Sequence, residues 1–371
     1  MKYAGRLAAT AAIAGVLSLA ACGTDDNVTS STSGTSAAAA EGPAPSGLSG
    51  TINAAGSSAQ ANAMAEWRKA FQSSNPEVSI NYQPSGSGAG VQAFIQGTVA
   101  FAGSDSALNE GKGEPAQADA RCATGKAINL PMVTGPVAVV YNLPGADGLQ
   151  LSPKTLAGIF DSKITKWDDP AIKADNPDAQ LPSTAIQAFH RSDESGTSDN
   201  FTKFLKATSD WPYEAAKAWP AEAKGQGAKG SDGIAAAVKG TEGAIGYVEL
   251  SFAENSQLQK AKVANGSGEF VELTPESAGK TVEAAEIVGT GNDLKLKIDY
   301  ATDAPGAYPI VLVTYEITCE KGLPAADVSL VKSFLAYTAS DAGQQALSGL
   351  GYAPLPTGLV GKVRTAIDAI S

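Results

Sequence analysis

A run of hydrogen-bond donors at residues 191–199 offers the clearest chemistry in the sequence. Arg191 stands four residues before Ser195, which Gly196 and Thr197 follow directly. Apolar residues at helical spacing come next, so the run predicts a strand end, a tight turn and a helix start. The free N–H groups of a helix N-terminus attract anions, and the guanidinium and hydroxyl groups add donors there. The pattern favours a site for one small oxyanion, and an ordinary capped helix beside a surface arginine explains it equally well.

Three earlier segments also end on polar side chains. Short alternating or apolar runs predict strands that each lead into a turn, within residues 50–58, 78–82 and 99–105. A helix over residues 59–74 follows the first of them, with Ser57 or Ser58 expected as its N-cap. The polar residues at or just beyond the three strand ends are Ser58, Ser87 and Asp105. Ligands gather at the carboxyl ends of the strands in an open parallel sheet, so we expect these side chains to meet there.

The length of the chain indicates two domains, because about 320 residues beyond residue 48 exceed one compact core. Three apolar runs, at residues 127–133, 137–141 and 308–315, are interpreted as the crossings between two lobes. The residues between the crossings predict a second α/β unit. Its expected helices are at residues 152–160, 201–207 and 233–239, and its expected strands at residues 186–190 and 244–248.

The start of the chain carries a targeting signal. Basic residues precede an apolar stretch that is too short to span a bilayer, and the stretch ends in Leu-Ala-Ala-Cys at residues 19–22. This quartet resembles the lipobox of bacterial lipoproteins. We therefore expect residues 1–21 to be a signal peptide and Cys22 to carry a lipid that anchors an exported protein to the outer face of the cytoplasmic membrane. Plain secretion is the alternative. Residues 22–47 are poor in large apolar side chains and predict a flexible tether.

The other two cysteines, Cys122 and Cys319, form an even pair in a chain that is expected to be exported. They fall near the same predicted core, so we expect one disulfide between them. Two free buried thiols are the alternative.

Composition and motifs argue against several functions. The formal net charge of −11 argues against nucleic-acid binding through a broad basic surface. Residues 86–90 do not match a phosphate-binding P-loop, and neither Ser87 nor Ser195 has the glycine that precedes the serine of a nucleophile elbow. His190 is the only histidine, and we expect it to be packed or partly exposed and not catalytic. One histidine and two bonded cysteines supply too few ligands for a metal site, and no cofactor is expected.

Taken together, the motifs resemble the periplasmic phosphate-binding proteins of the high-affinity phosphate ABC transporter, in their lipoprotein form. The similarity runs from residue 48 to residue 356. Its main markers lie at residues 55–58, 85–90, 101–105 and 191–198, and supporting ones at residues 159–170, 243–249 and 351–356. The resemblance implies an α/β fold of two lobes, a type II-like periplasmic-binding-protein fold, with the ligand buried in the interlobe cleft and two hinge crossings. Residues 48–134 with 310–371 would form lobe I, and residues 135–309 lobe II.

The resemblance also implies a ligand set. Carried over by position, the phosphate-binding residues are Ser58, the Ala59 N–H, Ser87 and Asp105 from lobe I, and Arg191, Ser195, Gly196 and Thr197 from lobe II. Asp193 is expected to pair with Arg191 and hold its plane, and a solvated surface carboxylate is the alternative. A carboxylate at position 105 accepts a hydrogen bond from phosphate, which keeps a proton at neutral pH, and repels sulfate, which has none.

The function implied by the resemblance is capture of inorganic phosphate outside the cell by a monomer. The protein would deliver phosphate to the membrane permease subunits of an ABC importer and would not be an enzyme. Two alternatives stay open at this stage: an exported serine hydrolase or phosphatase using Ser87 or Ser195, and a binding protein for another oxyanion.

Overall fold

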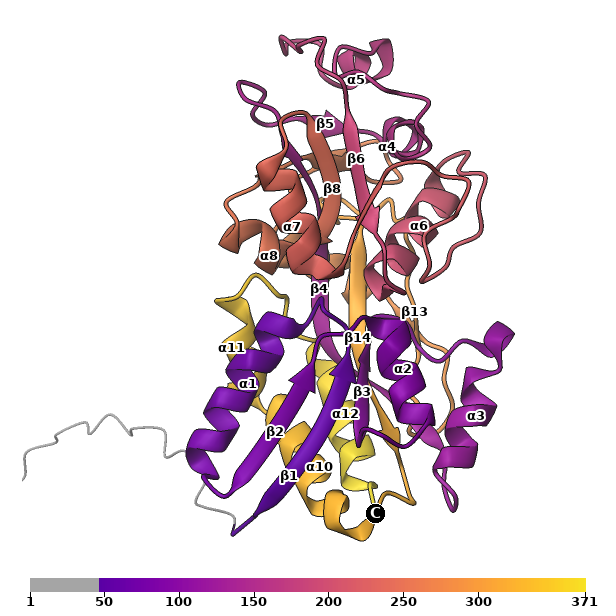
Figure 1. Ribbon diagram of the computed structural model, residues 1–371, viewed down its shortest axis with the longest axis vertical. Coiled ribbons are helices and arrows are strands. Elements are labelled where there is room, and N and C mark those ends of the chain that lie inside the picture. The colour runs from indigo at the N-terminus through magenta and orange to yellow at the C-terminus, as the bar shows by residue number, and fades with distance from the viewer. Residues whose placement is uncertain (1–46) are drawn as a thin grey trace, which may run out of the picture. The chain divides into compact units, whose positions relative to one another are not determined.

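Two long strands, β4 (Ala127–Asn142) and β14 (Val311–Cys319), form the centre of the fold. The structure is a computed structural model that describes residues 47–371, all of which belong to one compact unit (Figure 1). The two strands pair antiparallel, and every residue of both except Asn142 is buried. Strands that are apolar on both faces are typical of a sheet that helices cover on both sides. Cys22, the predicted signal peptide and residues 22–46 of the tether lie outside the described residues.

The first half of the fold adds a parallel set of strands to β14. β1 pairs in parallel with both β2 and β3, and β3 pairs antiparallel with β14. The strands are β1 (Gly50–Gly56), β2 (Val78–Gln83) and β3 (Phe101–Ser104). The helices of this half are α1 (Ala61–Ser74), α2 (Ser87–Ile95), η1 (Glu110–Lys112), α3 (Glu114–Arg121), α10 (Ala325–Thr338), α11 (Asp341–Ser348) and α12 (Thr357–Asp368).

The second half extends the same sheet from the other end of β4. The sheet order is β2-β1-β3-β14-β4-β8-β6-β7, with β9 paired to β4 beside this path. These strands are β6 (Gln187–Arg191), β7 (Gln226–Ala228), β8 (Ala244–Glu249) and β9 (Gln259–Lys260). The helices are α4 (Pro153–Phe160), α5 (Pro170–Asp175), α6 (Gly196–Thr208), α7 (Gly230–Gly240), α8 (Leu250–Asn255) and α9 (Pro275–Glu283). Two small sheets contain β5 (Gln150–Leu151), β10 (Lys262–Ala264) and β11 (Phe270–Val271), and β12 (Glu286–Ile287) and β13 (Leu296–Lys297).

Figure 1 shows β4 and β14 connecting the two halves, as the predicted crossings require. The separate apolar runs at residues 127–133 and 137–141 both belong to the single strand β4, and β14 is the second crossing. We call residues 47–134 with 310–371 the first lobe and residues 135–309 the second lobe. The boundaries at 134/135 and 309/310 stay a prediction.

The helix after β1 confirms its apolar stripe and corrects its start. Met64, Trp67 and Phe71 are buried, and the Phe71 ring packs edge-on against Phe334 of α10 at 5.4 Å. The helix begins at Ala61 with Gln60 at its N-cap, whose side chain makes no capping hydrogen bond. The prediction of Ser57 or Ser58 as N-cap was therefore wrong, because both hydroxyl groups make other contacts, described below.

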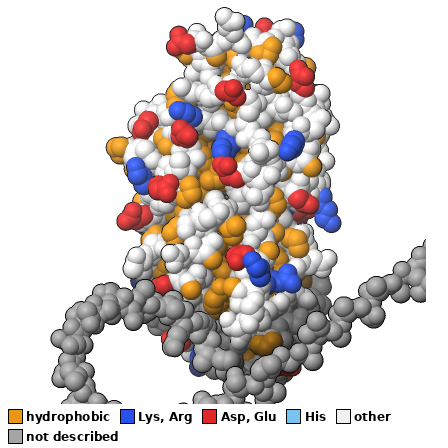
Figure 2. Space-filling view, turned by 90° about the vertical axis from the view of Figure 1, so that its left-hand side faces the viewer, with side chains coloured by type: hydrophobic (Ala, Val, Ile, Leu, Met, Phe, Trp, Pro, Cys, Tyr) orange, Lys and Arg blue, Asp and Glu red, His pale blue; other side chains and the backbone are white. Residues whose placement is uncertain are grey.

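The surface is mixed in charge. On the face that Figure 2 shows, acidic and basic side chains are interspersed and no broad basic area appears. Within residues 47–371, no helix is long and apolar enough to cross a membrane.

The predicted disulfide is present. Cys122, which follows α3, is bonded to Cys319 at the end of β14, and 197 positions of sequence separate the two residues. Both side chains are buried. The bond therefore ties the first part of the first lobe to the strand on which the chain returns to that lobe.

We predict that replacing both cysteines, Cys122→Ser with Cys319→Ser, lowers the free energy of unfolding by about 2–5 kcal/mol, because the bond restricts the unfolded chain over a long loop. Urea denaturation under oxidising conditions measures the difference. A reductant should lower the free energy of unfolding of the wild type to that of the double variant and leave the value of the variant unchanged. Equal unfolding midpoints for the two proteins without reductant would contradict the prediction.

Candidate functional site

The turn before α6 is built as a capped helix start. Ser195 is the N-cap, and its Oγ accepts a hydrogen bond from the Ser198 N–H at 3.2 Å. Gly196 and Thr197 are the first two residues of the helix, and their N–H groups have no partner within a helix of this geometry. Ser195 and Thr197 are each only 1% exposed. These donors therefore point into an enclosed space and not into solvent.

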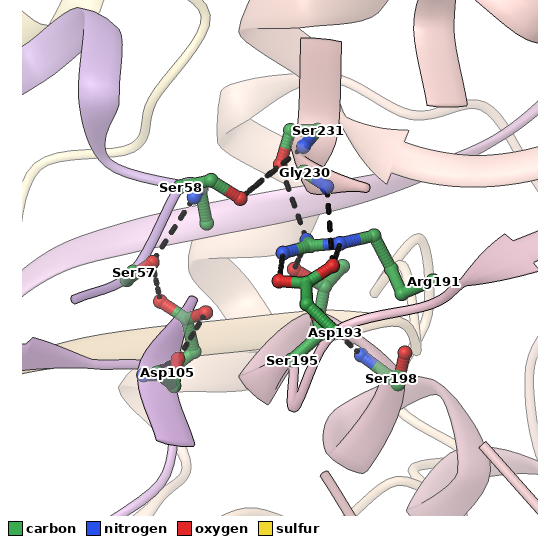
Figure 3. Close-up of polar contacts among 12 residues, drawn as sticks. Ser57, Ser58, Asp105, Arg191, Asp193, Ser195, Ser198, Gly230 and Ser231 are labelled. Carbon is green, nitrogen blue, oxygen red and sulfur yellow. Dashed lines mark hydrogen bonds and ion pairs between the residues drawn. The ribbon is translucent and has the colours of Figure 1, made fainter. Parts of the chain in front are cut away.

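Arg191 ends β6 beside this turn and is 2% exposed. Its Nε and Nη2 donate to the two carboxylate oxygens of Asp193 at 2.8 and 2.5 Å, which is the predicted ion pair (Figure 3). The Gly230 N–H donates to Asp193 at 3.1 Å as well. Burial alone would raise the pKa of Asp193, but the guanidinium of Arg191 holds it below its usual range. Asp193 therefore fixes the plane of the guanidinium.

The remaining nitrogen of Arg191, Nη1, faces hydroxyl groups. It lies 3.4 Å from both Thr197 Oγ1 and Ser231 Oγ. Thr197 in turn donates to Oε1 of Glu249 at 2.5 Å. Glu249 is fully buried, and within residues 47–371 its Oε2 has no hydrogen-bond partner.

Asp105 lies on the opposite lobe, directly after β3, and is 3% exposed. Its Oδ1 accepts from Ser57 at 2.5 Å and from Thr314 at 2.8 Å, and its Oδ2 accepts from Ser87 at 3.0 Å. Burial raises the pKa of Asp105 to about 6, and the charge of Glu249 adds to this effect while the three hydroxyl groups oppose it. The carboxyl group can thus take or release a proton near neutral pH.

Glycine allows the two lobes to approach closely at this point. A Cβ atom at Gly196 would lie 2.6 Å from both the Asp105 Cβ and the Ser87 Oγ. The Gly88 N–H donates to the Glu194 carbonyl at 2.9 Å, and a Cβ at Gly88 would lie 2.4 Å from the Glu194 Cβ. The glycine-rich turn of the first lobe therefore packs directly on the turn that carries Arg191 and Ser195.

Ser58 and Ala59 also lie at the site, with their polar groups engaged by neighbours. Ser58 Oγ lies 3.0 Å from Ser231 Oγ and accepts the Ser231 N–H at 3.2 Å, a contact that joins the lobes (Figure 3). The Ala59 N–H donates to Ser57 Oγ at 3.0 Å. All eight predicted ligand residues are thus brought to one place, together with Asp193.

Sequence reasoning missed four polar residues at the site: Ser57, Ser231, Glu249 and Thr314. A signal existed for Ser231, because it follows Gly230 at the start of α7, and Gly230 has a φ of +74°. Thr314 lies inside a buried strand and Glu249 ends one, so neither had a local pattern to reveal it.

A second set of contacts closes the lobes over Asp105. The Asn200 side chain donates to the Asp105 carbonyl at 2.7 Å, and Ser106 donates to Asp199 at 2.5 Å. Lys217 and Glu114 form a buried ion pair across the lobes at 3.4 Å. A cavity of about 510 Å³ borders Asp105 and Asn200 here, but Arg191 does not line it. The donor groups around Arg191 are buried, as the low exposure of Arg191, Ser195 and Thr197 shows.

The histidine takes no part in the cluster. The His190 ring stacks on Trp219 at 4.9 Å, and its Nδ1 lies 3.0 Å from the Arg191 carbonyl oxygen. The hydroxyl groups of Ser87 and Ser195 are bound to Asp105 and to the Ser198 N–H instead. Among the described residues, no group of three His, Cys, Asp or Glu side chains is placed to hold a metal ion. His190 is therefore not placed to act as a general base for Ser87 or Ser195.

The fold and the enclosed donor cluster between its lobes define a binding protein of two α/β lobes. A family model described as "PBP superfamily domain" matches residues 31–342. Phosphate-binding protein PstS 3 of Mycobacterium tuberculosis is 44% identical over 363 residues, covering 96% of each chain, and PstS 2 of the same species is 41% identical over 377 residues, covering all of both chains. The structure of a phosphate-binding protein from Stenotrophomonas maltophilia is similar in fold, with a TM-score of 0.64 at 20% identity over 85% of this chain and 93% of the other. The chain therefore belongs to the PBP superfamily and, within it, to the PstS family of phosphate-binding proteins.

We predict that the free energy of unfolding of the wild type decreases between pH 4 and pH 7 and that Asp105→Asn lacks this decrease. A carboxyl group whose pKa rises from 3.8 to about 6 on folding stabilises the protein at acidic pH, and this stabilisation is lost as the pH rises through about 6. At about 1.4 kcal/mol per pH unit, the change amounts to about 3 kcal/mol. Urea denaturation of both ligand-free proteins from pH 4 to pH 7 measures it. The free energy of unfolding of the wild type should fall relative to that of the variant over this interval, and parallel profiles would contradict the assignment.

Proposed function

We propose that this protein binds inorganic phosphate outside the cell and delivers it to the membrane subunits of an ABC importer. The observation that carries the proposal is the position of Asp105, an acceptor that titrates near neutral pH, against the donor cluster of Arg191 and the α6 N-terminus. The relatives that share 41–44% of its sequence along nearly the whole chain are named phosphate-binding proteins, and this supports the same ligand.

The ligand residues in this proposal are those predicted from the sequence. The phosphate oxygens would accept from Arg191 Nη1, the N–H groups of Gly196 and Thr197, and the Ser195 hydroxyl on the second lobe. On the first lobe the donors are Ser58, the Ala59 N–H and Ser87. Asp193 keeps the guanidinium in plane, and a planar fork of donors suits an oxyanion.

Asp105 supplies the selectivity. Its Oδ1 accepts two hydrogen bonds and its Oδ2 accepts one, so Oδ2 retains a lone pair for a proton on the ligand. Oδ2 also faces the α6 start, because a Cβ at Gly196 would lie 2.8 Å from it. A phosphate ion near neutral pH carries a proton to donate there. Sulfate carries none and would place its charge against the carboxylate.

The cross-lobe contacts support a cycle of opening and closing. Ser58–Ser231, Gly88–Glu194 and Lys217–Glu114 each join one lobe to the other, so an open form must break all three. The strands β4 and β14 would act as the hinge, with the lobe boundaries at 134/135 and 309/310. The closed form would dock on the permease as a monomer. Cys22 would carry the lipid anchor that keeps the protein at the outer face of the cytoplasmic membrane.

Isothermal titration of the purified protein, stripped of bound ligand, tests the proposal. We expect phosphate to bind one to one and sulfate to give no heat, because only phosphate brings a proton to Asp105. In Asp105→Asn, phosphate affinity should fall at least tenfold, and the ratio of phosphate affinity to sulfate affinity should decrease. No phosphate binding by a folded wild type would reject the function. An unchanged ratio in the variant would reject the role of Asp105, and turnover of a phosphomonoester would point to the hydrolase alternative.

A second prediction concerns the space at Gly196. Gly196→Ala should reduce phosphate affinity more than tenfold, because the added methyl group collides with Asp105 and Ser87 and holds the lobes apart. Gly279→Ala is the matched control, since it lies in helix α9 with open space around its Cβ position. Calorimetry should show near wild-type binding for the control. Equal phosphate affinities of Gly196→Ala and Gly279→Ala would show that phosphate binding does not need the close approach of the two lobes at Gly196.

A further inference from the structure

A carboxyl group is buried behind the site. Glu316 lies on β14 two residues after Thr314, which donates to Asp105. It is fully buried, and within the described part of the chain neither of its oxygens has a hydrogen-bond partner of good geometry. Gln60, at the start of α1, is also fully buried, and its Oε1 lacks a partner as well. Two unsatisfied acceptors in one core are costly unless a proton lies between them.

Gln60 leads to the site through a chain of hydrogen bonds. Its Nε2 donates to the Tyr82 hydroxyl at 3.0 Å, and that hydroxyl donates to the Ser57 carbonyl at 2.7 Å. Ser57 then donates through its Oγ to Asp105 at 2.5 Å. Because the single hydroxyl proton of Tyr82 goes to Ser57, its oxygen must accept from Gln60. This fixes the orientation of the amide and leaves Oε1 in need of a donor.

Glu316 is placed to be that donor. It lies opposite Gly103 in the pairing of β14 with β3. A Cβ at Gly103 would lie 2.1 Å from Gln60 Nε2 and 2.5 Å from the Tyr82 hydroxyl, so this glycine leaves the space that both side chains occupy. Burial raises the pKa of Glu316 to about 8, the charge of Asp105 adds to the rise, and the Gln60 amide acts against it.

Among the described residues, no cation that would favour the ionised form of Glu316 contributes to its pKa. The titratable neighbours whose charges couple to it are Asp105 and Tyr82, and burial together with Glu316 raises the pKa of Tyr82 well above its usual value. α2 and β3 carry no titratable side chain, and the one on β4, Tyr141, donates to the Ala146 carbonyl. The charged residues of the other helices packed on β14 are Asp199, Lys203 and Lys206 of α6 and Glu276, Lys280 and Glu283 of α9. None of these six charges contributes to the pKa of Glu316.

We propose that Glu316 is a positioning residue, held as the neutral acid, whose proton goes to Oε1 of Gln60 and so keeps Ser57 and Asp105 in place for the ligand. This inference rests on the proposed function. When Glu316 ionises in alkaline solution, its hydrogen bond to Gln60 Oε1 is lost, and with it the support of the chain that runs from Gln60 to Ser57. A second negative charge also appears behind Asp105, so phosphate affinity falls.

Calorimetric titration of the purified protein with phosphate from pH 6 to pH 10 tests the inference in three proteins. Glu316→Gln keeps a donor for Gln60 and cannot ionise, and Glu77→Gln removes one exposed carboxylate of the first lobe as the matched control. Glu316→Gln should bind within about threefold of the wild type at pH 6.5. Above pH 8 the wild type should lose affinity relative to Glu316→Gln by up to about tenfold per pH unit, the limit for one coupled proton. The control should follow the wild type at every pH.

The outcomes separate the two proposals. If the wild type binds phosphate and its affinity keeps a constant ratio to that of Glu316→Gln across the whole range, the role of Glu316 is overturned and the function stands. If the folded wild type binds no phosphate at any pH, the function itself fails. Carboxyl carbon NMR of wild-type protein with labelled glutamate gives a measurement that needs no variant. One glutamate should titrate near pH 8, and titration of all glutamates below pH 6 would also overturn the inference.

Discussion

An excess of buried negative charge at the site is the constraint on which the rest depends. Asp193 neutralises Arg191, and the carboxyl groups of Asp105 and Glu249 remain. The whole chain is also acidic, with a net charge of −11. Net Coulombic attraction therefore cannot hold an anion here. The attraction has to come from two sources. One is the set of oriented N–H dipoles at the start of α6, which act at short range and need no counter-charge. The other is the protons shared between ligand oxygens and protein oxygens.

Short-range donors can bind a ligand together only if the chain segments that carry them lie within one ligand diameter of each other. Glycine residues allow these segments to approach so closely. Asp105 and Ser87 reach the α6 start because Gly196 has no side chain, and Gln60 and Tyr82 fill the space that Gly103 leaves. The strands β4 and β14 carry both lobes and hold these segments in register. Thr314 shows the link directly, because this residue of a central strand donates to Asp105. A strand that connects the two lobes thus also carries a residue of the candidate site.

The local elements of the site could be predicted from the sequence, but the tertiary contacts between them could not. The turn from Arg191 to Ser195 could be interpreted because strand end, N-cap and helix start all have local signatures. The two apolar runs before residue 142 form one strand, because burial on both faces removes the alternation that would mark strand ends. Ser57 was assigned to helix capping, whereas its hydroxyl binds a carboxylate 48 residues away, a contact that no spacing rule reveals. Glu316 looked like an ordinary strand residue, and only its complete burial without a hydrogen-bond partner among the described residues distinguishes it.

The hydroxyl protons decide how such a site can exchange one anion for another. Each hydroxyl has one proton, and the protons of Ser57 and Ser87 go to Asp105 while that of Thr197 goes to Glu249. These hydroxyl groups therefore already donate hydrogen bonds to carboxylate groups of the protein itself. In the proposed site, a ligand that brings a proton would satisfy Asp105 Oδ2, so the Ser87 hydroxyl would be free to turn from Oδ2 toward the ligand. A ligand without a proton must compete with Asp105 for the same donors. The proposed selectivity for protonated anions would thus rest on the number of hydroxyl protons as well as on charge repulsion.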